Sequence, residues 1–503
     1  MKVIKTGFST WENKHETFVQ KIRDLYELAN DNSLGPLDSY NDTTKGLQSL
    51  IGEAITKQLP LRALGSGWSW TKIATAEEGL MLDTKPLNMI FDISGASVAS
   101  TYTGDPSKLF LAQCGNGVWE LSRFLKGRNL SLKTSGASNG QTIAGVTATG
   151  AHGSAFDVGA VQDFVVGMHI IVSPTRHIWL ERASAPVVSD TFIQHLQTEL
   201  IRDDDLFYSA LVCFGSFGII HGVMIETEDI FLLEASMSTM PFDPKLIQLM
   251  QTLDFSNTQL QLPYGVERPY HFAISLNPYD LEKGAYVTTM YKRPYRLGYK
   301  PPVRNLEGLG PGDDAPCFIG KLTQGIPALV PTLVTKLLAS NLTPYSKQFG
   351  ILGEIFDNTT LHGKLLSAAV GIPISYIKQA TDVLLAVNKT DGPFAGLFAY
   401  RFVKRSGAKL AFTRFDYTCV LELDAAFSDA TYAFYTAVWK KFEEEKIPFT
   451  FHWGKVNELD FTRISNMYGD DVKTWLASRN KLLDTDTKKV FTNATLTKWG
   501  LDV

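Results

Sequence analysis

The sequence has few cysteines and no motif that would turn them into a metal site or a disulfide framework. Its 503 residues contain four, at Cys114, Cys213, Cys317 and Cys419. They are far apart and form no C-x-x-C pair, so neither a zinc site nor a set of disulfides is indicated. Three of them stand in apolar or strand-like surroundings, which predicts ordinary core residues.

An excess of charge of one sign is also missing. The 48 Lys and Arg residues stand against 52 Asp and Glu residues, and no basic block occurs. Nucleic acid and anionic membrane surfaces are therefore not expected partners. The N-terminal MKVIKTGFSTWENKHE lacks the apolar core of a signal peptide, and no apolar run is long enough to cross a bilayer. We expect a soluble, cytoplasmic protein.

Two common nucleotide-binding motifs, G-x-G-x-x-G and G-x-x-x-x-G-K-[ST], are absent. The sequence has instead the stretch 133–156, KTSGASNGQTIAGVTATGAHGSAF, which is rich in Gly, Ala, Ser and Thr and nearly uncharged. Such small side chains let a backbone approach a ligand closely, with its N–H groups facing a polyanion. A flexible linker is the alternative, but Ile143, Val146 and the β-branched threonines favour an ordered loop for a phosphate-bearing cofactor.

Length and hydrophobic content predict more than one folded unit. A chain of 503 residues exceeds what one core usually serves, and 44% hydrophobic residues with 11% aromatics can fill large cores. Beyond about residue 228 the composition shifts toward aromatic residues and prolines, which indicates a second domain.

Local patterns predict several elements. Residues 15–30 mix apolar and charged positions at helical spacing, and residues 117–125 also read as a helix. Residues 165–172 and 177–181 predict a hairpin. The Leu/Ala/Lys-rich region 319–387 predicts helices broken at prolines.

The run Thr149-Gly150-Ala151-His152-Gly153-Ser154 resembles the end of the pyrophosphate-binding loop in flavoproteins of the vanillyl-alcohol oxidase type. Gly136-Ala137-Ser138 resembles the turn that lies against the isoalloxazine ring in that family, which includes aldonolactone and alditol oxidases and flavin-dependent cholesterol oxidases. The resemblance implies FAD as cofactor. It also implies an α+β fold with a two-subdomain PCMH-type FAD-binding domain and an α+β cap domain built on an antiparallel sheet.

The stretch LPLRALGSGWSWTKIA, residues 59–74, resembles the first flavin motif of the family, a strand with Arg followed by G-x-G-H-S. Trp68 stands where many relatives have the histidine that bonds covalently to the flavin. Because an indole offers no nucleophilic nitrogen, non-covalent FAD is the favoured expectation. Linkage through His152 is the alternative, and a hydrogen-bonding role of His152 toward loop backbone or phosphate is the simpler reading.

The resemblance extends to a turn near residue 218 and to the C-terminal tail, where Asp486, Phe491 and Asn493 match. Its implied domains are 1–228 for FAD binding, 229–445 for the cap, and 446–503 for a segment that returns to the flavin domain. Its implied cofactor-binding residues are Arg62, Gly65, Ser66, Gly67, Trp68, Ser69, Ser135, Gly136, Ala137, Ser138, Thr142, Gly145, Thr149, Gly150, His152, Gly153, Ser154, Gly218, Ile219, Lys455 and Asn493. No metal ligand is implied.

Two further segments resemble the substrate side of the family's active site. Phe398-Ala399-Tyr400-Arg401-Phe402 is similar to a strand reading E-V-R-F, with Ala399 in place of its glutamate. Alternation along a strand puts residues 399 and 401 on one face, so the usual pair is reduced to Arg401. The run from Pro448 to Lys455, PFTFHWGK, resembles a P-H-W-[AG]-K signature whose lysine lies by flavin N1 and stabilises the reduced cofactor.

The catalytic residues implied are Lys455, Arg401, His452 and Tyr400. Because Ala399 removes the usual carboxylate, the base is unassigned among His452, Tyr400, Glu354 and Glu422. The resemblance implies an FAD-dependent oxidoreductase that oxidises a CH–OH group of a small alcohol, polyol, sugar or lactone, with O2 as electron acceptor. A dehydrogenase with another acceptor, or a non-catalytic flavin-binding protein, is the alternative. The substrate and the oligomeric state are left open.

Overall fold

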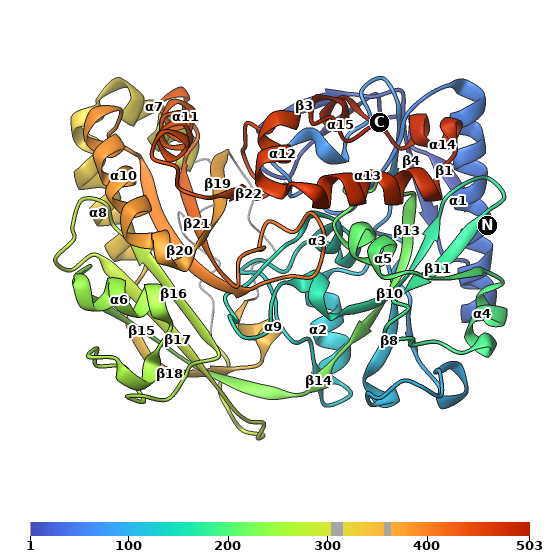
Figure 1. The fold of residues 1–503 in the computed structure, drawn as a ribbon, viewed down its shortest axis with the longest axis horizontal. Helices are drawn as coiled ribbons and strands as arrows, with labels where there is room; N and C mark the ends of the chain where they lie inside the picture. Colours follow the sequence, from blue (N-terminus) through green and yellow to red (C-terminus); the bar gives the residue numbers. More distant parts are fainter. Residues whose placement is uncertain (1, 303–314, 357–363) are drawn as a thin grey trace.

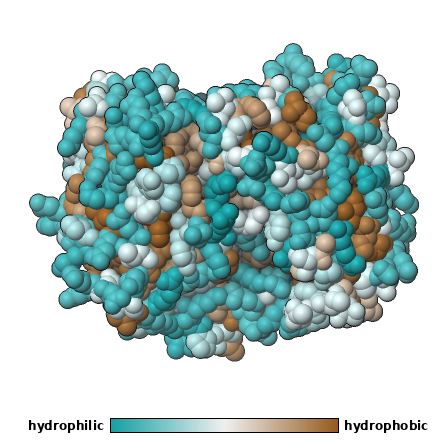
Figure 2. Space-filling model, viewed as in Figure 1, coloured by the Kyte–Doolittle hydropathy of each residue, from teal (hydrophilic) through white to brown (hydrophobic). Residues whose placement is uncertain are grey.

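The computed structural model describes residues 2–302, 315–356 and 364–503. Their helices and strands form two halves that meet along the middle of the molecule, with both termini in the same half (Figure 1). The face shown in Figure 2 is mostly hydrophilic and is notched at the top, where the halves meet. One cluster of buried apolar side chains nevertheless runs through both halves, from Tyr26 to Leu501.

The N-terminal half begins with a four-stranded sheet. Its strands, in spatial order, are β1 (Lys2–Lys5), β4 (Asp24–Ala29), β6 (Leu80–Asp83) and β5 (Leu61–Leu64). Strands β4 and β5 both run parallel to β6, whereas β1 is antiparallel to β4. Helix α1 (Pro36–Lys57) buries Leu47, Leu50 and Ile51, whose spacing forms one apolar stripe. Strand β5 ends directly before the segment that begins at Gly65.

A six-stranded sheet completes this half. Its strands, in spatial order, are β12 (Glu199–Arg202), β11 (His177–Glu181), β10 (Val165–Ile171), β13 (Ile219–Glu226), β8 (Leu109–Gln113) and β7 (Ile90–Asp92). Nearly every position of β8, β10 and β13 is buried, which is typical of strands covered on both faces. Its neighbours include α2 (Val118–Lys126), α3 (Ile143–Thr149), α4 (Asp190–Leu196) and α5 (Asp204–Leu211).

The other half is built on an eight-stranded sheet, here called the cap sheet. Its strands, in spatial order, are β18 (Tyr345–Gly350), β15 (Phe231–Met240), β17 (Ala285–Pro294), β16 (His271–Leu276), β20 (Gly396–Lys404), β21 (Tyr417–Ala426), β19 (Leu365–Pro373) and β22 (Thr450–Phe451). Adjacent strands are antiparallel throughout. Its outer face carries α6 (Pro244–Thr252), α10 (Ile377–Thr390) and α11 (Asp429–Glu444) (Figure 1). Helices α7 (Ala315–Gly325), α8 (Val330–Asn341) and α9 (Leu352–Ile355) complete this half.

After β22 the chain returns to the N-terminal half. Figure 1 shows its last helices, in red, lying across the same half as both termini. They are α12 (Phe461–Tyr468), α13 (Asp470–Leu482), α14 (Thr485–Val490) and α15 (Ala494–Lys498). Helix α13 packs on α5, and Trp475 Nε1 donates a hydrogen bond to the Val212 carbonyl at 3.0 Å. This return passes residues 452–455 between the two halves.

Several local predictions are confirmed. The hairpin is β10 and β11, paired antiparallel, and the helix expected at 117–125 is α2. Cys114, Cys213 and Cys419 are buried free thiols. Among the described residues, no helix has the length and apolarity needed to cross a membrane.

Two local predictions are wrong. Residues 15–30 contain strands β3 (Val19–Lys21) and β4 instead of a helix, because β4 buries alternate residues and pairs on both sides within its sheet. The region 319–387 includes strands β18 and β19 among its helices. Strand β19 is a short, almost wholly buried apolar run between β21 and β22, and such runs cannot be told from buried helix by periodicity.

Candidate active site

A cavity of about 590 Å³ lies where the two halves meet. Its walls are the segment after β5, the loop around α3 and the turn before β13 on one side, and the cap sheet with residues 452–455 on the other. This volume falls within the usual range for ligand and cofactor sites.

Two loops of the N-terminal half pack so closely that only glycine fits at their contacts. A Cβ atom on Gly65 would lie 2.1 Å from Thr142 Oγ1, and one on Gly153 would lie 2.3 Å from the Ser135 carbonyl oxygen. The glycines therefore hold the 65–69 segment and the two arms of the 133–156 loop together. This packing presents both segments to the cavity.

The cavity has unpaired polar groups on its flavin side. The backbone N–H groups of residues 66–69 and 136–138 donate to no other described residue. The ring nitrogens of His15 and Oε1 of Gln141 are buried and likewise have no hydrogen-bond partner in the part of the chain that the structure describes. Because buried polar groups are normally hydrogen-bonded, this set predicts a polar ligand with several acceptors. The residues present fit FAD.

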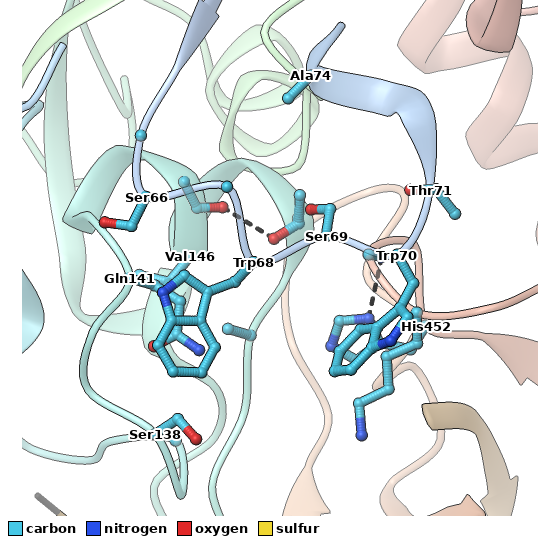
Figure 3. A pocket seen from close by; sticks show the side chains of 18 of the residues that line it. Ser66, Trp68, Ser69, Trp70, Thr71, Ala74, Ser138, Gln141, Val146 and His452 are labelled. Atoms are coloured by element: carbon cyan, nitrogen blue, oxygen red, sulfur yellow. Dashed lines mark hydrogen bonds between the residues drawn. The ribbon is translucent and has the colours of Figure 1, made fainter. Parts of the chain in front are cut away.

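Aromatic side chains line the cavity beside these groups. Trp68 and Trp70 project from the segment that follows β5 (Figure 3), and the His15 ring stacks on Trp70 with centroids 3.8 Å apart. Burial lowers the pKa of His15 to about 3, so the ring is neutral near pH 7. Neutral aromatic planes suit the packing of a flat heterocycle.

Arg62 braces the site. Its side chain is buried, and its guanidinium donates to the main-chain carbonyls of Ile73, Phe214, Gly215 and Phe491. Burial lowers the pKa of Arg62 to about 10, which leaves it charged at neutral pH. These four carbonyls belong to segments that are far apart in the sequence, so one cation connects the 72–74 turn, the turn before β13 and the C-terminal tail.

A cluster of charged side chains stands on the cap side. Arg401 Nε lies 2.9 Å from Glu422 Oε2, and Lys455 Nζ lies 2.5 Å from Glu422 Oε1. The Glu422 side chain is only 3% exposed. Burial by itself would raise the pKa of Glu422, but the two cations outweigh it and hold the pKa below its ordinary value. Glu422 is therefore an anion clamped between two cations.

The register of the cap sheet explains how Glu422 reaches this place. Ala399 on β20 lies directly opposite Glu422 on β21, and Ala369 on β19 lies opposite it on the other side. Directly paired residues of antiparallel strands share a face. The carboxylate missing at position 399 is thus supplied from the neighbouring strand, between two small side chains that leave it room.

Two histidines, His152 and His452, line the cavity between the charged cluster of the cap side and the 133–156 loop. His152 Nδ1 lies 3.0 Å from the Gly153 carbonyl, and its Nε2 lies 3.9 Å from Glu422 Oε1. Burial lowers the pKa of His152 to about 4. The Gly454 N–H donates to His452 Nδ1 at 3.1 Å, and burial also lowers the pKa of His452. Both rings are neutral near pH 7, and each lines the cavity.

Tyr400 and Glu354 lie away from this site, contrary to their prediction as catalytic candidates. Tyr400 points to the outer face of the cap sheet, where its hydroxyl pairs with Thr381 of α10 at 2.8 Å. The alternation that aims Arg401 inward aims Tyr400 outward. Glu354 binds Lys126 and Tyr299. Neither is among the residues that line the cavity.

Most of the predicted cofactor-binding residues line the cavity: Arg62, Gly65, Ser66, Gly67, Trp68, Ser69, Gly136, Ala137, Ser138, Thr142, Gly145, Thr149, His152, Gly218 and Lys455. The others are not among the residues that line it: Ser135, Gly150, Gly153, Ser154, Ile219 and Asn493. Ser154 joins the halves, since it donates to the Phe272 carbonyl and accepts from the Phe402 N–H. The Asn493 amide donates to the carbonyls of Lys72, Ile73 and Thr75.

Sequence reasoning missed Asp424, which lines the cavity two positions beyond Glu422. Ser367 donates a hydrogen bond to its Oδ1. The signal was present in the alternation Glu422-Leu423-Asp424, since alternate residues of a strand share one face and two carboxylates would then stand together. Within the ranges that the structure describes, no group of three His, Cys, Asp or Glu side chains could hold a metal ion.

The unpaired amides, the aromatic wall and the facing charged cluster define the class of protein: a flavoprotein. Comparison with known proteins agrees, since residues 40–179 match the family model of the FAD binding domain. This match covers less than half of the chain and includes both glycine-containing segments, residues 65–69 and 133–156, that line the cavity.

Two solved structures share the fold over almost the whole chain. Cholesterol oxidase from B. sterolicum aligns with a TM-score of 0.70 at 16% identity, over 99% of this chain and 97% of that one. A solvent-stable cholesterol oxidase aligns with a TM-score of 0.67 at 14% identity, over 98% and 97%. At such identities the likeness concerns the fold.

Curated relatives match over a shorter stretch. An L-gulono-1,4-lactone dehydrogenase of Mycobacterium tuberculosis is 26% identical over 187 residues, which are 37% of this chain and 36% of that protein. A D-arabinono-1,4-lactone oxidase of Debaryomyces hansenii is 24% identical over 208 residues, 41% and 34% of the two chains. The chain thus matches about a third of the length of these relatives.

Proposed function

We propose that this protein is an FAD-dependent oxidoreductase that oxidises a CH–OH group of a small molecule. Bound FAD would supply the two-electron oxidation of the carbinol carbon, and an electron acceptor would reoxidise it. The names of the relatives, lactone oxidases and dehydrogenases and cholesterol oxidases, support this class of reaction.

The observation that carries the proposal is the position of Arg401 and Lys455. Both cations line the cavity from the cap side and face loops that fit FAD. Fixed positive charges in a site shielded from water stabilise negative charge that develops on a substrate oxygen or on a reduced cofactor. A protein that only stored or sensed flavin would not need this arrangement.

The remaining cap wall favours a substrate with an apolar body. Beyond the charged cluster the cavity is lined by Leu337, Leu365, Ala395, Leu397, Ala425 and Ala426, with Asn341 beside them. Apolar walls reward a hydrocarbon and offer few partners to additional hydroxyl groups. Among alcohols, polyols, sugars and lactones, we therefore rank alcohols with one hydroxyl and a hydrocarbon portion first.

The proposed domain boundaries follow the course of the chain through the two halves. Residues 1–228 are proposed as the FAD-binding domain and residues 229–445 as the cap, since β15 enters the cap sheet at Phe231. Residues 446–503 return to the flavin domain, which the packing of α13 on α5 supports. Oxygen is the proposed electron acceptor and the cytoplasm the proposed location, with a dehydrogenase using another acceptor as the alternative.

Anaerobic reduction tests the proposal. The purified, FAD-loaded protein is mixed without oxygen with a panel of hydrocarbon alcohols, polyols, sugars and lactones, while the visible flavin absorbance is followed. Bleaching by a member of the panel is expected, and hydrocarbon alcohols should bleach fastest. Absence of bleaching by every class contradicts the proposal and favours a flavin-binding protein without catalysis. Rapid return of colour on admitting air then separates an oxidase from a dehydrogenase.

A further inference from the structure

Two carboxylates, Glu422 and Asp424, stand on one face of β21 but differ in their exposure and their contacts. Glu422 and Asp424 both line the cavity. The Glu422 side chain is 3% exposed, whereas 40% of the Asp424 side chain is exposed. Paired carboxylates in one site commonly divide into a fixed ion and a group that exchanges protons. The contacts of Glu422 and Asp424 indicate which of the two is the fixed ion and which can exchange a proton.

Glu422 is engaged on both oxygens. Lys455 holds Oε1, and Arg401 forms an ion pair with Oε2 without hydrogen-bond geometry. These cations hold the pKa of Glu422 below its ordinary value, against the effect of burial. So acidic a group is a weak base. Its role is to fix the two cations in place.

Asp424 has the opposite surroundings. Ser367 on β19, directly opposite in the sheet, donates to Oδ1, and within the described chain no protein donor is bonded to Oδ2. Lys455 Nζ lies 4.0 Å from Oδ1, a longer separation than the 2.5 Å that joins it to Glu422 Oε1. Although 40% of its side chain is open to the cavity, the protein that encloses this cavity keeps bulk water away and raises the pKa of Asp424. Repulsion from Glu422 adds to this effect, while Lys455, the Ser367 hydrogen bond and Arg401 oppose it.

The position of Asp424 also suits contact with a substrate. On β20 its direct partner is Leu397, a residue of the apolar part of the cavity wall. Asp424 therefore stands at the boundary between the charged cluster and the apolar wall. A hydroxyl group whose hydrocarbon portion occupies the apolar part would meet the Asp424 carboxylate at this boundary.

We propose that Asp424 is the catalytic base, taking the hydroxyl proton of the substrate on Oδ2, to which no described residue donates, while Glu422 serves as the fixed counter-ion of Arg401 and Lys455. The inference rests on the proposed function. The substrate O–H bond breaks as an O–H bond forms on Asp424, and the electron pair left behind becomes the second bond of the carbonyl. The carbinol hydrogen leaves with its bonding pair for oxidised FAD, and the proton on Asp424 later passes to solvent.

The test compares Asp424→Asn with Asp416→Asn, a matched change on a side chain that is 97% exposed. With an alcohol that bleaches the wild type, Asp424→Asn should slow anaerobic flavin reduction by about 10²–10⁴-fold, the usual contribution of a general base. Its affinity for FAD, measured by calorimetry, should match the wild type. Asp416→Asn should leave both quantities unchanged.

The pH dependence separates a base from a packing residue. In the wild type, reduction should accelerate as pH rises through the raised pKa of Asp424, and the Asn variant should lack this limb. Infrared difference spectra give a readout apart from turnover: a protonated carboxyl band should persist above the ordinary Asp pKa and vanish in Asp424→Asn. In Asp424→Ala, added formate should restore part of the rate.

The outcomes distinguish the two proposals. If no alcohol bleaches the wild type, the proposed function fails. If the wild type is bleached and Asp424→Asn is reduced equally fast, with the same pH profile, the function stands and Asp424 is not the base. Loss of FAD binding with a normal rate per bound flavin would likewise overturn the role of Asp424 as a base.

Discussion

Arg401 and Glu422 are joined diagonally across β20 and β21, with the guanidinium Nε 2.9 Å from the carboxylate Oε2. Glu422 also holds Lys455, so one buried anion positions both cations of the candidate site. Charges buried in this way are stable only together, because each alone would lose its hydration without compensation. The charged cluster therefore behaves as one unit, and changes to its members should not be additive.

Replacing the anion should destabilise the fold. Glu422→Gln removes the carboxylate that Arg401 and Lys455 share, and breaking a buried pair costs about 3–5 kcal/mol. We expect the free energy of unfolding to fall by about 3 kcal/mol, the lower end of this range, since Arg401 keeps some exposure. Urea denaturation measures it. Glu78→Gln, in a surface pair with Lys21, is the control and should cost less than about 1 kcal/mol. Equal losses in the two variants would contradict the role of the buried pair.

The same variant predicts a pH dependence with a definite sign. The pKa of Glu422 is depressed in the folded protein, so its stabilising effect is complete above the unfolded pKa of about 4.3 and is lost as pH falls through the folded value. The stability difference between wild type and Glu422→Gln should be constant from pH 8 to about pH 5 and shrink below about pH 4. A difference that grows on acidification, measured by urea denaturation at each pH, would disprove the linkage.

Lys455→Met should separate chemistry from cofactor retention. The methionine keeps much of the apolar stem but removes the positive charge, and losing one such stabilising group slows reactions by about 10²–10³-fold. We expect anaerobic flavin reduction to slow by this factor, with a much smaller change in FAD affinity by calorimetry. Lys441→Met, at an exposed site on α11, is the control. Unchanged reduction in Lys455→Met would remove this residue from the site.

Arg62→Met should weaken the fold itself. Arg62 donates to the main-chain carbonyls of Ile73, Phe214 and Gly215 and to that of Phe491 in the C-terminal tail. Hydrogen bonds from a charged group contribute about 1.5–3 kcal/mol each. We expect the free energy of unfolding to fall by at least about 3 kcal/mol, and FAD affinity to fall with it. Arg405→Met, on a side chain that is 60% exposed, should change neither. A normal unfolding curve for Arg62→Met would show that the carbonyls find other donors.

Acid precipitation decides how FAD is attached. Trp68 cannot form the covalent bond, so we expect a colourless pellet and a yellow supernatant. A yellow pellet would instead indicate covalent attachment. His152→Ala, which removes the alternative attachment residue, should then release the colour into the supernatant. A pellet that stays yellow in His152→Ala would exclude His152 as the link.

The flavin side of the site could be predicted because its signals are local. In residues 65–69 and 133–156, two loops approach so closely that a larger side chain at the contact would clash. Glycine is therefore needed at those positions, and this need is visible in the sequence. Most predicted cofactor residues accordingly line the cavity. The prediction of a helix at residues 15–30 was wrong because β4 pairs with β1 and β6, and this pairing outweighs the helical spacing of apolar residues.

The cap side could be predicted only in part. Arg401 and Lys455 were found through short motifs, and both line the cavity. Glu422 was one of four candidate bases, and the sequence did not indicate where in the site it lies. Asp424 was missed. Their positions depend on which residue of β21 stands opposite which residue of β19 and β20. That register cannot be read from one strand at a time.

The sequence by itself determined the cofactor loop, the cationic motifs and the class of protein, because glycine-rich turns and strand alternation act over a few residues. The tertiary structure alone decided that the carboxylate absent at Ala399 comes from Glu422, that Tyr400 faces outward, and that Asp424 stands at the cavity with one oxygen to which no donor of the described ranges is bonded. The physical reason is distance along the chain. Long-range pairing brings together residues 367, 397, 401, 424 and 455, and the charges that set the pKa values of the two acids become neighbours only when the sheet forms.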